Sequence, residues 1–415
     1  MKALFVTYGG GHVHMVNNVA RALTQLAPSA EIKILGLPSA LPILEKTEFE
    51  VLSFADVIEP ANDTQVLDWG EELATVHHSD HTGIDRAQSI AYLGLSFGDL
   101  VKSVGYQAAR KSVDTVGRKA FFPLTALNRA FDLTTPDIVI TTNSPRAEAA
   151  AIAAANARNI PTISMVDLFG GIKDYKIEAK DVTVLNKHAL EMLCDAGIVD
   201  LDISNVHFTG NPAFDTIIEN TEQIDCSALK NHIPDLKEKS SVLHADIPAW
   251  VCPETGMAHI KSEMEILDEL TTVWRAAKEA KAIYLLRPHP GQSRHLFRDF
   301  TAKHKDCYLV DEFPLYMLLK SVDLLVARST TVALEAVYMR KNILQLEPHL
   351  HTDMPLAKMG VAVGAALTNS LAAAIEKCLL QKSVTETTLQ NMNKLFPHEV
   401  AAPKIASLIA QRTNL

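Results

Sequence analysis

The chain has 415 residues, of which 47% are hydrophobic and 21% charged, and this length favours two domains because a single core stops growing at about 250–300 residues. The net charge of −10 and the lack of a lysine- or arginine-rich block argue against a nucleic-acid groove, so no nucleic-acid partner is expected. Five dispersed cysteines without ligand-type spacing indicate a reducing compartment and no zinc site, and the short apolar start indicates no signal peptide. A cytoplasmic location is therefore expected.

Buried strands and helices alternate in the first half of the chain. Helices are predicted at 14–26, where apolar residues recur at helical spacing, and at the alanine-rich 146–158. Continuous apolar runs are typical of strands covered by helices on both faces, and their alternation with helices indicates a parallel sheet. The predicted strands are 2–7, 31–35, 138–142, 162–166, 182–185 and 206–208.

Residues 70–130 interrupt this alternation. They contain long helical patterns, few strands and the polar segment TVHHSDHTGIDR (75–86). The region is either an insertion that shapes the pocket of a second substrate, or a solvent loop followed by packing helices.

The second half repeats the strand–helix pattern after a polar, helix-poor stretch at 216–240, which we take as the domain boundary. We expect an α/β protein with two doubly wound Rossmann-like domains facing an interdomain cleft, 1–215 and 216–395, and a C-terminal helix (396–415) that packs back on the first domain. Ligands of such domains bind at the carboxyl ends of the strands. The predicted strands are 241–244, 282–286, 307–310, 323–327, 343–346 and 361–364.

The first strand ends in the segment TYGGGH (7–12). Gly9, Gly10 and Gly11 permit a tight turn and a close approach to a ligand, and the helix that follows presents its N–H groups to an anion. His12 then places a near-neutral base at the strand end, or it caps its helix.

Several segments resemble the GT-B glycosyltransferases, in particular the N-acetylglucosaminyltransferase that completes the peptidoglycan lipid precursor. Related enzymes of this superfamily are the UDP-N-acetylglucosamine 2-epimerases and a UDP-sugar hydrolase. The opening stretch YGGGHVHMVNNVARAL carries the resemblance. It continues in the same order in TPDIVITTNSP (135–145), NIPTISMVDLFG (159–170), VHFTGNPAFD (206–215) and DLLVARSTTVALEA (323–336).

The resemblance implies roles for the matching residues. His12 or Asp167 is the expected base, and Asn143 and Asn211 lie in loops expected to face the substrate. Glu335 is expected to accept hydrogen bonds from the ribose hydroxyls. Ser329, Thr330 and Thr331 are expected to bind the diphosphate; otherwise they form an ordinary helix cap.

The segment YLLRPHPG (284–291) adds a strand that ends in Arg287 and His289, with a proline after each of them. Arginine pairs bidentately with phosphate and the prolines hold the loop rigid, so these two residues are expected to bind the donor. The alternative is a salt-bridged loop.

Together these features predict an inverting glycosyltransferase with a nucleotide-sugar donor, UDP-linked by preference, and a carbohydrate or lipid-linked acceptor of cell-envelope polysaccharide type. No cofactor and no bound metal are expected. The first alternative is a UDP-sugar hydrolase or 2-epimerase; epimerase chemistry is disfavoured because GGGH replaces that family's arginine loop. The second is a non-catalytic nucleotide-sugar-binding protein. A lipid-linked acceptor implies peripheral contact with the inner face of the membrane, through apolar residues of 85–125.

Overall fold

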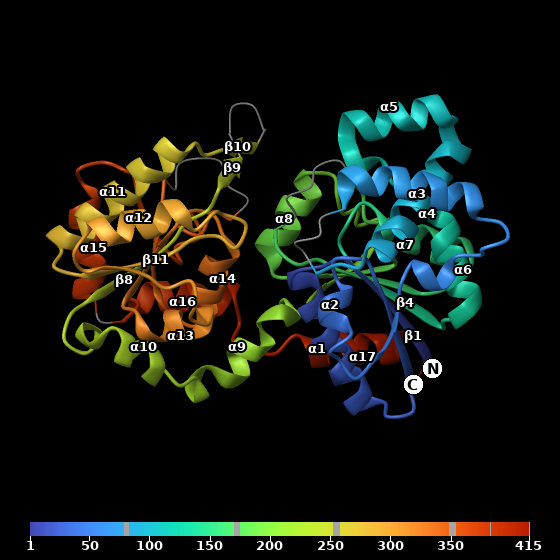
Figure 1. The fold of residues 1–415 in the computed structure, drawn as a ribbon. Helices are drawn as coiled ribbons and strands as arrows, with labels where there is room; N and C mark the ends of the chain where they lie inside the picture. Colours follow the sequence, from blue (N-terminus) through green and yellow to red (C-terminus); the bar gives the residue numbers. More distant parts are fainter. Residues whose placement is uncertain (79–82, 170–174, 252–257, 348–353, 382, 415) are drawn as a thin grey trace. The chain divides into compact units, whose positions relative to one another are not determined.

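The computed structural model describes residues 1–415 except 79–82, 170–174, 252–257, 348–353, 382 and 415. The chain divides into two compact units (Figure 1). Unit 1 comprises Met1–Asp215 and Val400–Leu415, and unit 2 comprises Thr216–Glu399.

Unit 1 is built on a seven-stranded parallel sheet with the strand order β3-β2-β1-β4-β5-β6-β7. Side chains alternate along β1, so that Leu4 and Val6 enter the core on one face while Ala3 and Phe5 enter the core on the other. The strands are β1 Lys2–Thr7, β2 Glu31–Gly36, β3 Glu50–Leu52, β4 Ile138–Thr142, β5 Thr162–Met165, β6 Asp181–Val184 and β7 Asn205–Phe208.

Helices cover both faces of this sheet. The helices α1 (Gly11–Leu26) and α17 (Ala402–Arg412) share the core on one face and lie side by side (Figure 1). Asp215 fixes the start of α17 by accepting hydrogen bonds from the backbone N–H groups of Ala401 and Ala402. The other face carries α3 (Thr64–His77), α4 (Arg86–Val104), α5 (Tyr106–Val116), α6 (Leu124–Thr134) and α7 (Ala147–Ala157).

Unit 2 contains a six-stranded parallel sheet with the order β12-β11-β8-β13-β14-β15 and a small hairpin, β9 (Ala249–Val251) with β10 (Ala258–Ile260). The strands are β8 Ser241–Ala245, β11 Ile283–Arg287, β12 Cys307–Leu309, β13 Leu324–Ala327, β14 Asn342–Leu346 and β15 Val363–Ala365. The helices that share a core on one face of this sheet are α11 (Glu263–Glu279), α12 (His295–Lys303) and α15 (Leu371–Leu380). Others in the unit are α10 (Ser227–His232), α13 (Leu315–Ser321), α14 (Thr331–Tyr338) and α16 (Glu386–Leu395).

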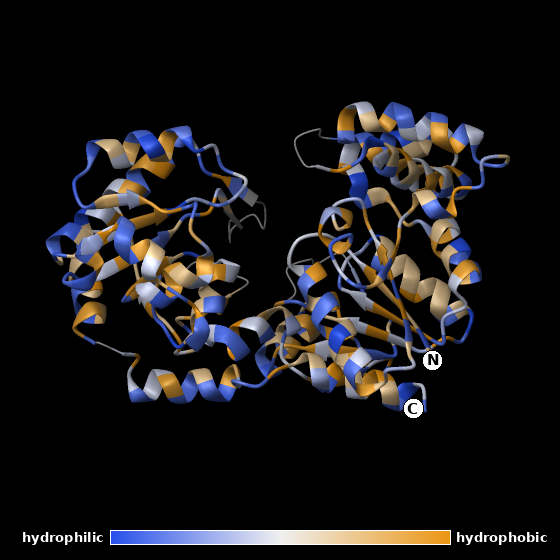
Figure 2. Cartoon of the chain, turned by 60° about the horizontal axis from the view of Figure 1, so that its bottom comes forward, coloured by the Kyte–Doolittle hydropathy of each residue, from blue (hydrophilic) through white to orange (hydrophobic). Residues whose placement is uncertain are grey.

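The hydropathy pattern of the helices follows from their packing against the two sheets. Figure 2 shows polar and apolar residues alternating along the outer helices, as expected when one stripe of each helix packs on a sheet. Both sheets are doubly wound, which confirms the predicted fold class of two Rossmann-like domains. The strand order reverses between β1 and β4 in unit 1 and between β8 and β13 in unit 2. Ligands of this fold class bind at such switch points.

Every predicted strand is present, most within one residue of its expected bounds. Sequence reading missed β3 and the β9–β10 hairpin, because each is three residues long and carries no sustained apolar run. The description of 216–240 as helix-poor was wrong: this stretch holds most of α9 (Asp215–Asn220) and all of α10. Short helices that gain their stability from tertiary packing leave little periodicity to detect.

Candidate functional site

Two side chains predicted to act as a base come together at the switch point of unit 1. His12 lies in the first turn of α1, directly after β1, and Asp167 follows β5. The Nε2 atom of His12 lies 3.4 Å from Oδ2 of Asp167, with 17% and 26% of the two side chains exposed. This His12–Asp167 pair is therefore accessible to a substrate.

The glycines before His12 are needed for two separate reasons. Gly10 has a φ of 68°, a conformation that residues with a Cβ rarely adopt. A Cβ on Gly9 would lie 2.6 Å from Oγ of Ser39, so only glycine fits there, whereas a Cβ on Gly11 would meet no atom within 4 Å. The loop is closely packed at Gly9 and open at Gly11.

Two residues that were predicted to bind substrate form hydrogen bonds with the backbone of Asp167. The side chain of Asn143, from the loop after β4, accepts a hydrogen bond from the backbone N–H of Asp167 at 3.0 Å. Asn211 donates from its side-chain amide to the backbone carbonyl of the same residue. Both asparagines thus position the carboxylate relative to His12.

The electrostatic environment makes His12 a stronger base than a free imidazole and favours the ionised form of Asp167. Burial alone would lower the pKa of His12, but the hydrogen bond and charge of Asp167 and the charge of Glu148 outweigh it and raise that pKa. Burial would raise the pKa of Asp167, yet the hydrogen bond and charge of His12 hold it below its usual value. Nδ1 of His12 is enclosed and has no hydrogen-bond partner in the described part of the chain. Nε2 faces the carboxylate of Asp167, so a substrate hydroxyl would meet the pair at the edge that Nε2 shares with this carboxylate.

Glu148 lies beneath this pair as a fully buried acid in the first turn of α7. Its Oε1 accepts a hydrogen bond from Oγ1 of Thr142 at 3.2 Å, while Oε2 has no partner among the described residues. Burial raises the pKa of Glu148, and the charge of His12 opposes this rise.

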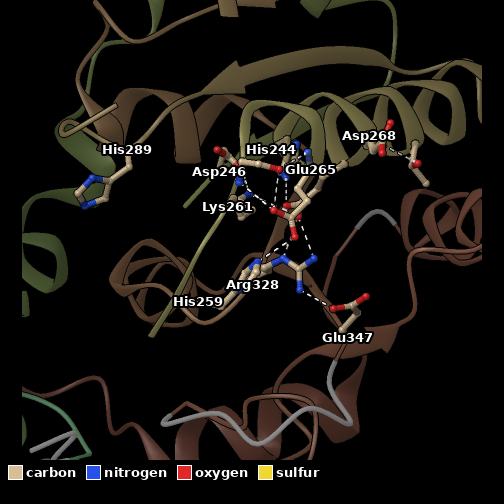
Figure 3. A network of polar contacts seen from close by, with 12 residues as sticks. His244, Asp246, His259, Lys261, Glu265, Asp268, His289, Arg328 and Glu347 are labelled. Atoms are coloured by element: carbon tan, nitrogen blue, oxygen red, sulfur yellow. Dashed lines mark hydrogen bonds and ion pairs between the residues drawn. The ribbon is translucent and has the colours of Figure 1, made fainter. Parts of the chain in front are cut away.

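The predicted donor-binding residues of unit 2 follow β11 and β13. Arg287 ends β11 and donates to the carbonyl of Phe313 at 2.9 Å, and burial lowers its pKa. His289 is exposed, its ring accepts a hydrogen bond from the N–H of Gly291, and its carbonyl accepts one from Arg294. Figure 3 shows His289 standing apart from the polar network of this unit.

Ser329 and Thr330 lie in the loop between β13 and α14, with Thr330 at the N-cap position without a side-chain cap bond, and Thr331 is the first residue of α14. Glu335 lies one turn into α14 and accepts a hydrogen bond from the hydroxyl of Tyr316 at 3.4 Å. Burial raises the pKa of Glu335 to about 7 against the opposing hydrogen bond of Tyr316 and the charge of Arg287. A carboxyl group with this pKa is half ionised near neutral pH.

A buried ionic network occupies the switch point of unit 2 (Figure 3). Lys261 pairs with Asp246, and its ammonium nitrogen lies 3.4 Å from Glu269. Arg328 bridges Glu269 at 2.8 Å and Glu347 at 2.5 Å. We call these five residues the unit 2 network. Four of them are buried, and Glu347 is partly exposed.

His244 and Gln292 extend the unit 2 network. His244 is fully buried, with Nε2 3.4 Å from Glu269 and Nδ1 2.6 Å from the hydroxyl of Tyr284. Gln292, from the loop that carries His289, donates to Asp246 at 2.6 Å. Burial would raise the pKa of Glu269, but His244 and the neighbouring cations hold it far below its usual range.

A metal ion does not fit this network well. His244, Asp246 and Glu269 offer ligand atoms within 4.8 Å of one another. However, the ammonium group of Lys261 already contacts both carboxylates and supplies the positive charge that a metal would bring.

Sequence analysis did not predict that the members of the unit 2 network interact, because they are far apart in sequence. One signal was present: Glu269 lies on the apolar stripe of α11 with Ile266, Leu270 and Val273, where an acid needs a buried partner. The polar cluster expected at 75–86 is only partly described, since Asp80 and His81 lie outside the described residues. No helix of the described residues is long and apolar enough to cross a membrane.

No protein-family model and no curated protein sequence matches the chain. Solved structures match it over nearly its whole length. The S. aureus MnaA–UDP co-structure is 16% identical, with a TM-score of 0.60 and 100% and 98% of the two chains covered. UDP-GlcNAc 2-epimerase from Neisseria meningitidis bound to UDP-GlcNAc is 14% identical, with a TM-score of 0.58 and 99% of each chain covered.

Glycosyltransferases match as well. The glycosyltransferase SnogD from Streptomyces nogalater is 14% identical, with a TM-score of 0.50 and 99% of each chain covered. At these identities the likeness establishes the fold. The chain shares its two-domain α/β architecture with UDP-GlcNAc 2-epimerases and GT-B glycosyltransferases, which confirms the resemblance seen in the sequence.

Proposed function

We propose that the chain is a nucleotide-sugar enzyme that transfers a sugar, with inversion, from a UDP-sugar to a hydroxyl of a glycan or lipid-linked acceptor. The His12–Asp167 pair carries the proposal. An accessible imidazole whose partner carboxylate stays ionised takes the proton of the acceptor hydroxyl as its oxygen attacks the anomeric carbon. General base catalysis of this kind contributes about 10²–10⁴-fold to a rate.

Features of unit 2 support the donor part of the proposal. The hydroxyls and N–H groups of Ser329, Thr330 and Thr331 suit a diphosphate at the start of α14, and Arg287 supplies a positive charge at the end of β11. Glu335, one turn along α14, suits the ribose hydroxyls. The presence of UDP or UDP-GlcNAc in similar structures favours a UDP-linked donor.

The chemistry itself has a second candidate. Several of the similar structures are UDP-GlcNAc 2-epimerases, which favours 2-epimerisation or hydrolysis of a UDP-sugar on the same fold. The three reactions differ in what attacks the sugar: an acceptor hydroxyl, water, or a base that removes the hydrogen from C2. A chain that binds UDP-sugar without turnover would be a binding protein.

One experiment separates these reactions. The full chain is incubated with UDP-GlcNAc in deuterated water, with and without a panel of sugar acceptors, while UDP release and deuterium at C2 are measured. Acceptor-dependent UDP release identifies the transferase, release without acceptor the hydrolase, and deuterium at C2 the epimerase. His12→Ala should abolish turnover, whereas His14→Ala should not, because His14 is the same residue type on an exposed position of α1. Equal activity of both variants would refute the role of His12.

Membrane contact is proposed only for a lipid-linked acceptor. Five large apolar side chains are exposed within residues 104–124, a segment spanning α5 and the start of α6, and they could reach a lipid surface. These residues are Val104, Tyr106, Val116, Phe122 and Leu124. Co-sedimentation with anionic vesicles tests this contact, and recovery of the chain in the supernatant alone would refute it.

A further inference from the structure

A cavity of about 220 Å³ opens in unit 1 between the loops after β1, β2 and β4 and the helices α3 and α4. The charged side chains that line it are Arg118 and Arg146, and none of the described lining residues carries a carboxylate. We call it the arginine cavity. Its volume is below the ~300–1,000 Å³ of pockets that enclose drug-sized ligands, so it suits a head group better than a whole substrate.

Arg146 is the partly buried cation of the arginine cavity. Its guanidinium carbon lies 4.9 Å from the centroid of the Tyr8 ring, and its NH1 atom lies 3.4 Å from the hydroxyl of Tyr92. It forms no ion pair with a carboxylate anywhere in the described chain. The nearby Glu148 is fully buried, and burial raises its pKa, so it compensates the guanidinium poorly.

Arg118 adds a second positive charge to the cavity. It is exposed, and the described residues offer it no ion-pair partner, whereas its neighbour Arg110 forms an ion pair with Glu72 at 3.0 Å. Burial lowers the pKa of His77 on the cavity wall, and the charges of Arg118 and Arg110 lower it further. A histidine whose protonation is suppressed in this way indicates a positive potential in the cavity.

We propose that the arginine cavity binds an anionic group, phosphoryl or carboxylate, of the second substrate. The assignment to a second substrate rests on the proposed function. Arginine pairs bidentately with both kinds of oxyanion, and an unpaired guanidinium over an aromatic ring is well placed to do so. The hydroxyl of Tyr92, whose pKa burial raises, remains protonated and can donate to the same anion.

The position of Tyr8 links the arginine cavity to the proposed base. The Tyr8 ring contacts the His12 ring edge-on with 5.9 Å between centroids, while it also lies under Arg146. An acceptor held by its anionic group therefore extends past Tyr8 toward the His12–Asp167 pair. This geometry selects acceptors such as sugar phosphates, polyprenyl-phosphate-linked sugars or acidic sugars over neutral ones.

The test is a binding measurement that does not depend on turnover. Histidine ring signals of the full chain are recorded by NMR at low ionic strength while inorganic phosphate or acetate is added, with His77 assigned through His77→Gln. We expect phosphate or acetate to raise the pKa of His77 and to saturate. Arg146→Gln should weaken this binding about ten-fold and Arg118→Gln about three-fold, because the guanidinium ion pair is lost.

Arg158→Gln is the matched control. Arg158 lies in the same unit but does not line the cavity, and it forms an ion pair with Asp132 at a distance of 2.7 Å. Saturation by phosphate alone would assign a phosphoryl group, and saturation by acetate a carboxylate. No shift of His77 with either ion, or equal affinity in Arg146→Gln and the unsubstituted chain, would overturn the proposal. Arg146→Lys, which keeps the charge, shows whether the Gln variant failed by misfolding.

The outcome is separable from that of the proposed function. Anion binding without any UDP release would support the anion site in the arginine cavity and refute the transferase proposal. UDP release without anion binding would support the proposed enzyme and refute the anion site.

Discussion

Replacing Glu335 with glutamine should stabilise unit 2 at alkaline pH and leave its stability almost unchanged at acid pH. The carboxyl is partly buried in α14, and burial raises its pKa from 4.5 to about 7 in the folded chain. Below pH 4.5 both the folded and the unfolded chain are protonated at this position. Between pH 4.5 and 7 the unfolded chain releases its proton first, so stability falls as pH rises, and above pH 7 the loss is complete.

The magnitude follows from the size of this shift. At 1.36 kcal/mol per pKa unit, a rise from 4.5 to about 7 corresponds to roughly 3 kcal/mol. Water reaches part of the side chain and screens the carboxylate, so we expect about 2 kcal/mol at pH 8.5. Glutamine has similar shape and keeps a polar atom for the hydroxyl of Tyr316, yet it does not ionise.

Urea unfolding followed by tryptophan fluorescence measures the effect. A Trp69→Phe background leaves Trp250 and Trp274, both in unit 2, so that the signal reports this unit. The Glu335→Gln difference should grow from near zero below about pH 4 to its full value above pH 7. Glu376→Gln, an exposed carboxylate on α15, is the control for loss of one charge. A difference that does not depend on pH would refute the argument from burial.

Three further changes test other parts of the structure. Asp167→Asn removes the charge that raises the pKa of its histidine partner, so the acid limb of the pH–rate profile should move to lower pH, with a loss of about 10²-fold at the plateau; an unmoved limb would contradict the pairing. Lys261→Met leaves the buried Asp246 without its cation and Glu269 with Arg328 alone, so it should cost unit 2 about 3–5 kcal/mol in urea unfolding, and a neutral result would show that the network is not buried as described. Gly9→Ala drives a Cβ against Ser39 and should lower the free energy of unfolding by about 1–3 kcal/mol, whereas Gly11→Ala meets open space and should not; equal free energies of unfolding for the two variants would refute the packing argument.

The positions of the strands along the chain could be predicted from the sequence. Strands of a parallel sheet covered on both faces are continuous apolar runs, such as Ile138–Thr142 and Leu324–Ala327, and each of them appears in its predicted place. That these strands pair in parallel followed from the α/β fold class, because strands alternate with helices along the chain. Elements of three residues, such as β3, bury too little apolar surface to be recognised without their neighbours.

Parts of the candidate site could be predicted because they sit at strand ends. His12, Asp167, Arg287 and Glu335 were singled out from loops and helices that follow strands, and the structure brings His12 and Asp167 together. The roles of the two asparagines could not be read in the same way. Asn143 is one residue past β4 and looks open to a ligand in sequence, yet its bond to the backbone of Asp167 depends on the neighbouring strand.

The partners of buried charged residues are the feature of this structure that a single sequence predicts least well. Glu148 in the alanine-rich α7 and Glu269 in the apolar stripe of α11 both interrupt a buried helix face, and both lie beneath a switch point. Their fates differ with their neighbours. Glu269 meets Arg328, Lys261 and His244 and stays ionised, so it anchors a network. Glu148 accepts a hydrogen bond from Thr142 and has no ion pair with a basic side chain among the described residues, so burial raises its pKa against the opposing charge of His12. An acidic residue on the apolar stripe of a helix therefore indicates a position where the folded chain must provide a polar partner. Whether that partner is a cation or a weaker neighbour decides whether the acid forms a stabilising ion pair, as Glu269 does, or mainly influences the pKa of a nearby base, as Glu148 does.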